Sequence, residues 1–108
     1  MITFEEFKNV NLIIAKVEEV EEIPNADKLY KLKIDIGNNE SRTIVAGIKK
    51  HYSPEELKER SIVFLENLAP ATIRGIESQG MLLAAKSEAG EISLILPDKA
   101  VEAGSTIS

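Results

Sequence analysis

Residues 30–36 alternate strictly between apolar and polar side chains, and this pattern restricts the fold more than any other stretch of the sequence. Successive side chains of a β-strand point to opposite faces, so strict alternation predicts a strand with one buried and one solvated face. We therefore expect a strand over residues 29–36. Its inward side chains would be Tyr30, Leu32, Ile34 and Ile36, and its outward ones Lys31, Lys33 and Asp35.

Other stretches predict strands on both sides of this one. The Gly37-Asn38-Asn39 sequence suits a hairpin turn that would return the chain as a strand over residues 42–46. Residues 10–20 are rich in β-branched side chains and predict a long, bulged first strand. Further strands are expected over residues 61–66, 80–85 and 92–96, the last two joined by a turn at Ala89-Gly90.

Two short helices are predicted from their capping residues. Thr3 and Glu6 have the spacing of a capping box, and Phe4 and Phe7 would share the apolar face of the helix that it opens. Residues 53–57 combine an N-cap serine, a proline at the first helical position and a glutamate at the third, which predicts a second helix. We expect all three phenylalanines, including Phe64, to be used in packing.

These elements are typical of an all-β protein. Five or six short strands with a small helix between the third and fourth match the oligonucleotide-binding (OB) β-barrel. A small β-sandwich fits the pattern nearly as well. Because no repeat, low-complexity segment or linker is visible, we expect one domain over residues 1–108, with the barrel at about residues 10–97.

Composition limits the class of protein. The absence of cysteine excludes disulfides and thiolate metal sites. No apolar run approaches the roughly 20 residues that cross a bilayer, and the first residues lack the features of a signal peptide. These observations predict a cytoplasmic protein without a membrane segment.

The charge balance is acidic, with 13 Lys and Arg against 18 Asp and Glu and a net charge of −5. Nucleic-acid-binding proteins usually carry a basic surface, so this balance counts against tight, promiscuous nucleic-acid binding. A local basic stripe on an acidic body can still bind a phosphate backbone. Any such binding is therefore expected to be weak and selective.

No group of residues indicates catalysis. His51 is the only histidine and has no Cys, Asp or Glu at ligand spacing, so we interpret it as a surface residue. The sequence has no Walker loop, no G-x-S-x-G and no H-E-x-x-H motif. We expect no enzyme activity, no cofactor and no metal.

Five short blocks, in order along the chain, resemble the tRNA-binding domain family. Residues 24–29 read Pro-Asn-Ala-Asp-Lys-Leu and residues 78–85 read Ser-Gln-Gly-Met-Leu-Leu-Ala-Ala, two blocks that the family shares. Residues 44–48, 67–70 and 74–76 are similar to its I-V-S-G-I, N-L-K-P and R-G-I stretches. The resemblance covers nearly the whole chain.

The resemblance implies an OB-fold, usually a homodimer, that recognises the outer corner of folded tRNA and has no catalytic activity of its own. The family includes the C-terminal domain of methionyl-tRNA synthetases, a free-standing subunit of that enzyme, stand-alone tRNA-binding proteins and CsaA-type chaperones. Expected partners are therefore tRNA, a second copy of the chain and a methionyl-tRNA synthetase catalytic chain. A CsaA-type peptide-binding secretion chaperone is the alternative function.

Several positions depart from the family pattern. Ile23 replaces a frequent histidine, Ala46 replaces a serine, and Ala69 and Thr72 replace residues that are often basic. Ile13 stands where the first strand often has an arginine. Each change removes a possible phosphate or base contact, which affects the expected affinity more than the fold.

The candidate tRNA-binding residues combine cations with polar and soft apolar groups, because folded RNA is read by shape, phosphate and 2′-OH contacts. The expected phosphate-facing stripe comprises Lys31, Lys33 and Arg42, with Lys28 and Arg74 at its ends. Asn25, Asp27, Ser78 and Gln79 would supply hydrogen bonds, and Met81 a platform for a base. The alternatives are a solvated strand face for the lysines, an Asx-turn for Asp27 and a core position for Met81.

The strands of an open barrel leave edges that need covering. The N-terminal helix and residues 101–107 lie outside the predicted barrel strands and are natural covers, from the same chain or from a second copy. We expect the C-terminal extension to take part in a symmetric homodimer.

Overall fold

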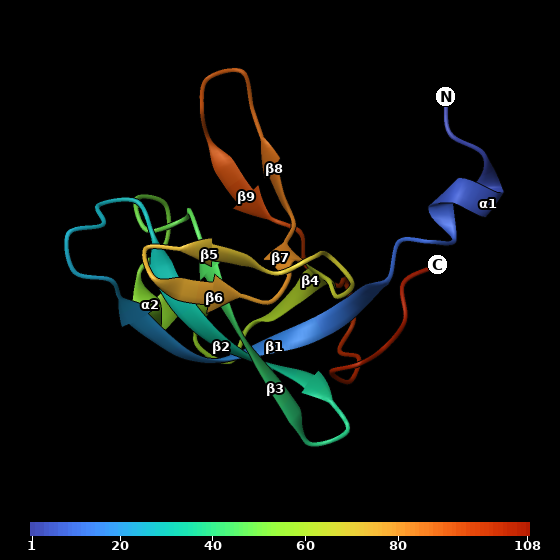
Figure 1. Cartoon of the computed structure of the whole chain (residues 1–108), viewed down its shortest axis with the longest axis horizontal. Helices are drawn as coiled ribbons and strands as arrows, with labels where there is room; N and C mark the ends of the chain where they lie inside the picture. Colours follow the sequence, from blue (N-terminus) through green and yellow to red (C-terminus); the bar gives the residue numbers. More distant parts are fainter.

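A computed structural model describes all 108 residues of the chain (Figure 1). Its elements follow one another in the order α1 (Phe4–Phe7), β1 (Leu12–Glu22), β2 (Tyr30–Gly37), β3 (Glu40–Ala46), α2 (Pro54–Leu57), β4 (Ser61–Leu65), β5 (Ala71–Ile73), β6 (Ile76–Ser78), β7 (Met81–Leu82), β8 (Ala84–Lys86) and β9 (Ile92–Leu94). Neither helix is long and apolar enough to cross a membrane.

The main sheet has five antiparallel strands in the order β3-β2-β1-β4-β7. It curls so that the segment entering β7 returns to the free edge of β3, where Gln79 N donates to Thr43 O at 2.9 Å. Helix α2 lies between β3 and β4 in the chain. This is the OB arrangement, and it confirms the all-β barrel prediction over the sandwich alternative.

The alternation of residues 30–36 is confirmed in the core. Tyr30, Leu32, Ile34 and Ile36 are all buried, and they join a cluster of 15 buried residues that includes Phe64. Leu57 of α2 is fully buried in the same cluster. Because burying each large apolar side chain contributes about 1.5–3 kcal/mol, this cluster is the main source of stability of the barrel.

Strand β1 is long because its first half pairs with β4 and its second half with β2. Leu12 to Lys16 pair with β4, and Lys16 to Glu22 pair with β2. The register with β2 shifts between Val17 and Glu19, which confirms the predicted bulge. Such a bulge increases the local twist and bends the strand, as closure of a small barrel requires.

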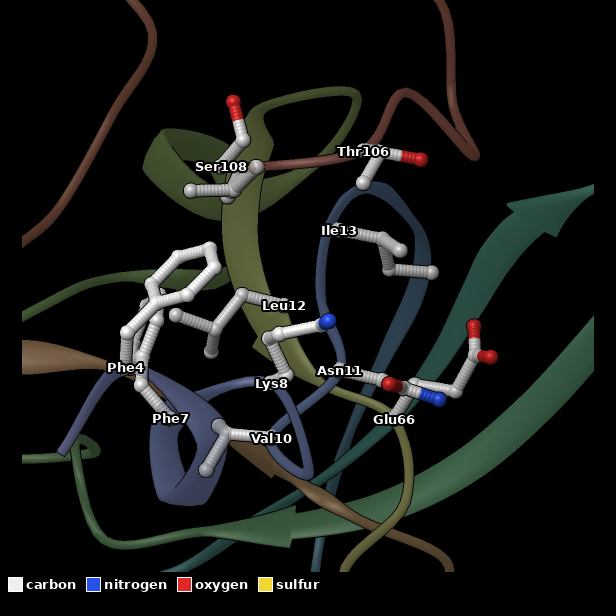
Figure 2. A pocket seen from close by; sticks show the side chains of 11 residues that line it. Phe4, Phe7, Lys8, Val10, Asn11, Leu12, Ile13, Glu66, Thr106 and Ser108 are labelled. Carbon is white, nitrogen blue, oxygen red and sulfur yellow. The ribbon is translucent and has the colours of Figure 1, made fainter.

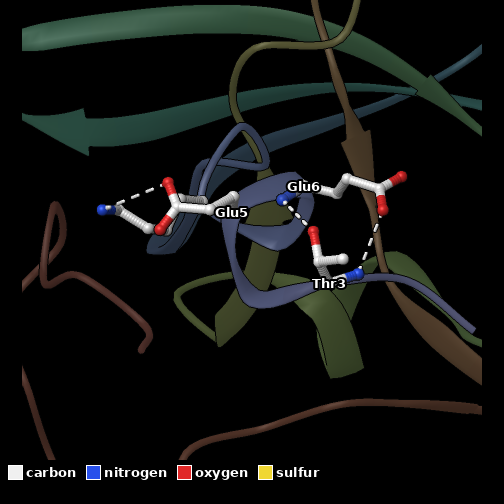
Figure 3. Close-up of polar contacts among 4 residues, drawn as sticks. Thr3, Glu5 and Glu6 are labelled. Atoms are coloured by element: carbon white, nitrogen blue, oxygen red, sulfur yellow. Dashed lines mark hydrogen bonds and ion pairs between the residues drawn. The ribbon is translucent and has the colours of Figure 1, made fainter.

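Helix α1 begins at the predicted capping box (Figure 3). Thr3 Oγ1 accepts from Glu6 N at 3.1 Å, and Glu6 Oε1 accepts from Thr3 N at 3.0 Å. The expected packing of Phe4 and Phe7 is wrong for the single chain, since they are 70% and 36% exposed. The helix is four residues long and extends away from the barrel, so no other element covers its apolar side (Figure 1).

The region after β4 differs most from the prediction. Residues 71–78 form a hairpin, β5–β6, that was not expected. Its turn residues Arg74 and Gly75 both have positive φ, 54° and 79°, as in a type I′ turn. The strand expected at residues 80–85 is divided into β7 and β8, and the last strand ends at Leu94. Strands β8 and β9 form a separate arm that projects from the barrel (Figure 1).

The C-terminal segment covers the edge of β1 from within the same chain. Ile14 N donates to Ser105 O, Gly104 N to Ile14 O and Ile107 N to Leu12 O, at 2.7–2.9 Å. These bonds occupy the part of β1 that β2 does not reach. The prediction that this segment covers a strand edge is confirmed for the chain's own β1.

We predict that Gly80→Ala lowers the free energy of unfolding by about 3 kcal/mol or more. Gly80 has φ +123°, and an added Cβ would overlap the buried Phe64 ring and lie 2.7 Å from Leu65 O. Gly75→Ala is the matched control, because Gly75 also has positive φ but no heavy atom lies within 4 Å of its Cβ position. It should cost about 1 kcal/mol. Urea denaturation measures both, and equal losses would contradict the packing argument.

Candidate nucleic-acid interface

The outward face of β2 carries the two predicted lysines, but acidic residues lie beside them. Lys33 is exposed and stands opposite Glu19 of β1, and Lys31 is half-buried and stands opposite Glu21. Lys31 Nζ lies 4.0 Å from Glu21 Oε2, whereas Lys33 makes no ion pair. Lys33 is therefore the more available cation on this face.

Arg42 is not part of that face. It pairs with Ile34, whose side chain is fully buried, so Arg42 lies on the inner side of β3 near the end of the barrel. Its Nη1 donates to Glu66 O at 2.6 Å, which links β3 to the end of β4. The expected stripe of Lys31, Lys33 and Arg42 is thus wrong in its geometry. The neighbours of Lys33 and Lys31 on β3 are Thr43 and Val45.

The loop between β1 and β2 presents three predicted residues to solvent. Ile23 and Ala26 are buried and anchor it, with Ala26 N donating to Ile23 O at 3.1 Å. Asn25, Asp27 and Lys28 are exposed. Asn25 has φ 62°, a conformation that asparagine tolerates better than most residues.

None of these three side chains makes a hydrogen bond within the protein, and the Asx-turn expected as an alternative for Asp27 does not form. The loop therefore offers an amide, a carboxylate and an ammonium group to a partner.

Ser78 and Gln79 are used to close the barrel. Ser78 is buried, and its Oγ accepts from Val45 N at 3.0 Å and donates to Gly80 O at 3.3 Å. Gln79 Oε1 accepts from Thr43 N at 3.1 Å. Both side chains accept hydrogen bonds from backbone N–H groups at the free edge of β3. They thereby fix the position of β3 beside the outer face of β2.

The last two predicted residues lie on the surface after β4. Met81 is 45% exposed and pairs with Leu65, so it points out of the core and remains available as a platform. Arg74 is exposed at the tip of the β5–β6 hairpin, which lies against β3. The structure thus brings the β1–β2 loop and the outer face of β2 together along one strand, with Met81 and Arg74 on separate elements.

Sequence reasoning missed a cluster of cations beyond the β1–β2 loop. Lys28 shares a pocket with Lys50, His51 and Lys86, which come from two other segments. His51 is exposed, in agreement with its interpretation as a surface residue. The signal that could have indicated this cluster is the Lys49-Lys50-His51 run in a strongly acidic chain.

Lys49 and Tyr30 form hydrogen bonds that fix the segments around this cluster of cations. Lys49 Nζ lies 2.6 Å from Glu22 Oε1, and this hydrogen bond raises the pKa of Lys49 above its usual range. Burial raises the pKa of Tyr30, which therefore stays a donor and bonds Tyr52 O at 2.8 Å. Tyr52 Oη in turn accepts from Leu94 N at 3.0 Å, which ties β9 to the barrel.

An apolar groove of about 410 Å³ is lined by both the N-terminal and the C-terminal segments (Figure 2). Phe4, Phe7, Val10 and Leu12 line it together with Ile107 of the C-terminal segment. Asn67 fixes the approach of α1, because its Oδ1 accepts from Asn11 N at 2.9 Å and its Nδ2 donates to Asn9 O at 2.7 Å. The groove is therefore an exposed apolar surface, and the hydrogen bonds of Asn67 fix the backbone between α1 and β1 that lines it.

Comparison with known proteins gives a consistent result. Residues 12–106 match a family model described as "Putative tRNA binding domain". A methionine–tRNA ligase of Pyrococcus furiosus is 51% identical over 106 residues, which are 98% of this chain and 14% of the ligase. A methionine–tRNA ligase of Methanococcus aeolicus is 49% identical over 99% of the chain and 16% of the ligase. The chain therefore spans only about a seventh of the curated relatives that it matches.

Solved structures match the chain over its full length. A MetRS-related protein from Pyrococcus horikoshii has a TM-score of 0.93 and 38% identity, covering 100% of this chain and 98% of that one. A CsaA chaperone from Bacillus anthracis has a TM-score of 0.89 and 33% identity, covering 100% and 99%. The resemblance of the sequence blocks is thus confirmed by the family model, by relatives and by fold.

We predict that Ser78→Ala destabilises the barrel by about 1–3 kcal/mol, because Val45 N–H loses its acceptor at a part-buried edge. Amide hydrogen exchange should show faster exchange at Val45 than at its neighbours within β3. Ser41→Ala removes an exposed hydroxyl from the same strand and should change stability by less than about 0.5 kcal/mol. Unchanged Val45 protection in Ser78→Ala would contradict the closing role.

Proposed function

This chain belongs to the tRNA-binding domain family, and on that basis we propose that it binds folded tRNA through the β1–β2 loop and the outer face of β2. The match of residues 12–106 to the family carries this proposal, because it covers every strand of the barrel. The exposed groups of Asn25, Lys28 and Lys33 supply the contacts along this surface. We propose the outer corner of tRNA as the ligand.

The polar contacts on this surface suit recognition by shape. Lysines position a phosphate backbone without reading bases, and an amide such as that of Asn25 can bond a phosphate, a 2′-OH or a base edge. Glu19 and Glu21 lie beside the lysines and weaken non-specific attraction to polyanions. The result is modest affinity with selectivity for a folded ligand.

We propose that Ser78, Gln79 and Arg42 act as positioning residues in this interaction. Their polar atoms bond the backbone of β3, Gly80 and Glu66, so they fix the outer face without contacting RNA. Met81 and Arg74 are exposed, and we propose them as peripheral contacts.

The proposed biological role is that of a non-catalytic tRNA-binding subunit beside a methionyl-tRNA synthetase catalytic chain. The supporting observation is that a methionine–tRNA ligase contains a region 51% identical to 98% of this chain. A binding module of this kind raises the local concentration of tRNA near a catalytic chain.

We further propose that two copies associate through the apolar groove of Figure 2. Phe4 and Phe7 are exposed in the single chain, and their packing against a second copy would bury apolar surface. A symmetric dimer uses the same patch twice and would present two tRNA-binding faces. Two weak faces acting together would offset the low affinity of each.

A peptide-binding chaperone role is the second candidate. Two CsaA chaperone structures cover the whole chain at TM-scores of 0.89 and 0.90, and the exposed apolar groove is a surface that an apolar peptide could occupy. This role would depend on the groove, whereas tRNA binding would depend on the loop and β2. Variants in these two surfaces therefore separate the two functions.

We expect the double variant Lys31→Ala/Lys33→Ala to lower affinity for folded tRNA about tenfold, because it removes two cations from the proposed face. The slope of log affinity against log salt should fall by about 1 for each phosphate that the variant no longer neutralises. Lys58→Ala/Lys99→Ala changes the net charge equally at two other exposed lysines and is the control.

Binding is measured at two salt concentrations against total folded tRNA, with an unstructured RNA of similar length for comparison. Selective binding that only the β2 variant weakens supports the proposal. Absence of binding by the unmodified chain at low salt, together with binding of apolar peptides, would move the chaperone role to the front.

We expect Phe4→Ser/Phe7→Ser to shift the chain from dimer to monomer in sedimentation equilibrium. The substitutions remove the largest exposed apolar groups of the groove and leave the Thr3–Glu6 capping box intact. Leu96→Ser replaces a 45% exposed side chain outside the groove and should leave the dimer unchanged. A monomeric unmodified chain would refute the dimer without affecting the proposal for tRNA binding.

A further inference from the structure

A basic pocket of about 430 Å³ lies where three segments of the chain meet. Lys28 comes from the β1–β2 loop, Lys50 and His51 from the loop after β3, and Lys86 from the end of β8. Gly47 and Gly90 line the same pocket. Basic side chains from three segments that are distant in sequence thus converge on one hollow.

The pocket differs from the rest of the surface in its charge. The chain carries five more acidic than basic residues, yet no acidic residue lines this pocket. Its three lysines make no ion pair, whereas the nearby Lys31 and Lys49 are paired with Glu21 and Glu22. Lysines that lie close together without acidic partners repel one another, and an anionic ligand would offset this repulsion.

The walls of the pocket are connected by hydrogen bonds, so its shape does not depend on a ligand. Lys49 N donates to Lys28 O at 3.2 Å and joins the β1–β2 loop to the loop after β3. Leu94 N donates to Tyr52 Oη at 3.0 Å and joins that second loop to β9. Glu91 N donates to Ser87 Oγ at 3.0 Å and shapes the turn of the β8–β9 arm. A preformed site loses less entropy on binding than one that must be ordered.

Backbone donors are also available there. The N–H groups of Gly47 and Lys50 make no hydrogen bond within the protein, and both residues are exposed. The open space beside Gly47 allows close approach, since the nearest atom to an added Cβ is a leucine methyl group at 3.9 Å. Lysine ammonium groups and backbone N–H groups together are typical ligands of phosphate oxygens.

We propose that this pocket binds a phosphate group of the RNA backbone and forms a second contact point for tRNA, beyond the outer face of β2. The inference rests on the proposed tRNA binding and names a part of the surface that carries it. Lys28 belongs to both surfaces, because it lies in the β1–β2 loop and also lines the pocket. The pocket supplies unpaired cations, which the face of β2 has only in Lys33.

The test removes Lys50 and Lys86 together, since they approach the pocket from different segments. Lys50→Ala/Lys86→Ala should reduce affinity for folded tRNA about five- to tenfold and lower the salt slope by about 1–2. Both side chains are exposed and form no ion pair, so the fold should be retained; circular dichroism and thermal unfolding check this. Lys58→Ala/Lys99→Ala again matches the change in net charge. Equal affinities and salt slopes for the pocket variant and the unmodified chain would overturn the inference.

A second measurement uses inorganic phosphate and does not require tRNA binding. In ¹⁵N-resolved NMR titrations, phosphate should give saturable shifts at the amides of Gly47, Lys50 and Gly90, which Lys50→Ala/Lys86→Ala abolishes.

Loss of tRNA binding in the β2 variant but not in the pocket variant would leave the proposed function standing and remove the pocket from it. Failure of the unmodified chain to bind any tRNA would refute the proposed function. In that case saturable phosphate shifts would still support the pocket as a phosphate site, and their absence would overturn it.

Discussion

The free edge of β3 is joined to residues 78 and 79, at the end of β6, by three hydrogen bonds, two of which use the side chains of Ser78 and Gln79. A strand edge with unpaired N–H groups exposes them to solvent or to another chain. These two side chains satisfy the N–H groups of Thr43 and Val45 where no regular strand pairs with them. The curvature of the barrel, and with it the orientation of the outer face of β2, depends on this closure.

The distribution of charge follows from the register that the closed sheet imposes. The bulge in β1 sets Glu19 opposite Lys33 and Glu21 opposite Lys31, so the face of β2 is nearly neutral although it is rich in charged residues. Lys33 makes no ion pair, and further unpaired lysines gather beyond this face, in the β1–β2 loop, the loop after β3 and at the end of β8. An acidic protein can in this way keep a local basic surface without a basic strand face.

The sequence predicted the elements whose pattern is local. The alternation of residues 30–36, the bulged first strand and the helix caps at Thr3 and Ser53 were all confirmed, because each is set by neighbours in the chain. The β5–β6 hairpin was missed because its strands have three residues each, too few to show a period. The type I′ turn at Arg74-Gly75 was its one local signal.

The candidate site could be predicted only in part. Arg42 was placed on the wrong face, although it is two residues from Ile44 and a period of two assigns both to the same side. The irregular register at Gly37, which shifts β3 by one residue, could not be read from the sequence. The packing of Phe4 and Phe7 depends on whether another surface covers α1, and amphipathic spacing does not specify that surface. The pocket of Lys28, Lys50, His51 and Lys86 is assembled by tertiary contacts, and the Lys49-Lys50-His51 run in the sequence indicates only one of its three segments.

The pairing of the C-terminal segment with β1 has a consequence for the order in which the protein assembles during synthesis. Ile14 leaves the ribosome 90 residues before Gly104, the residue that donates to its carbonyl group. The core strands can pair earlier, but the edge of the first strand stays open until residues 104–107 are available. Contacts of long sequence separation form slowly because the loop between them must first be closed. The nascent chain therefore passes through a stage with a nearly complete barrel and one unprotected edge, at which pairing with another chain competes with completion of its own fold.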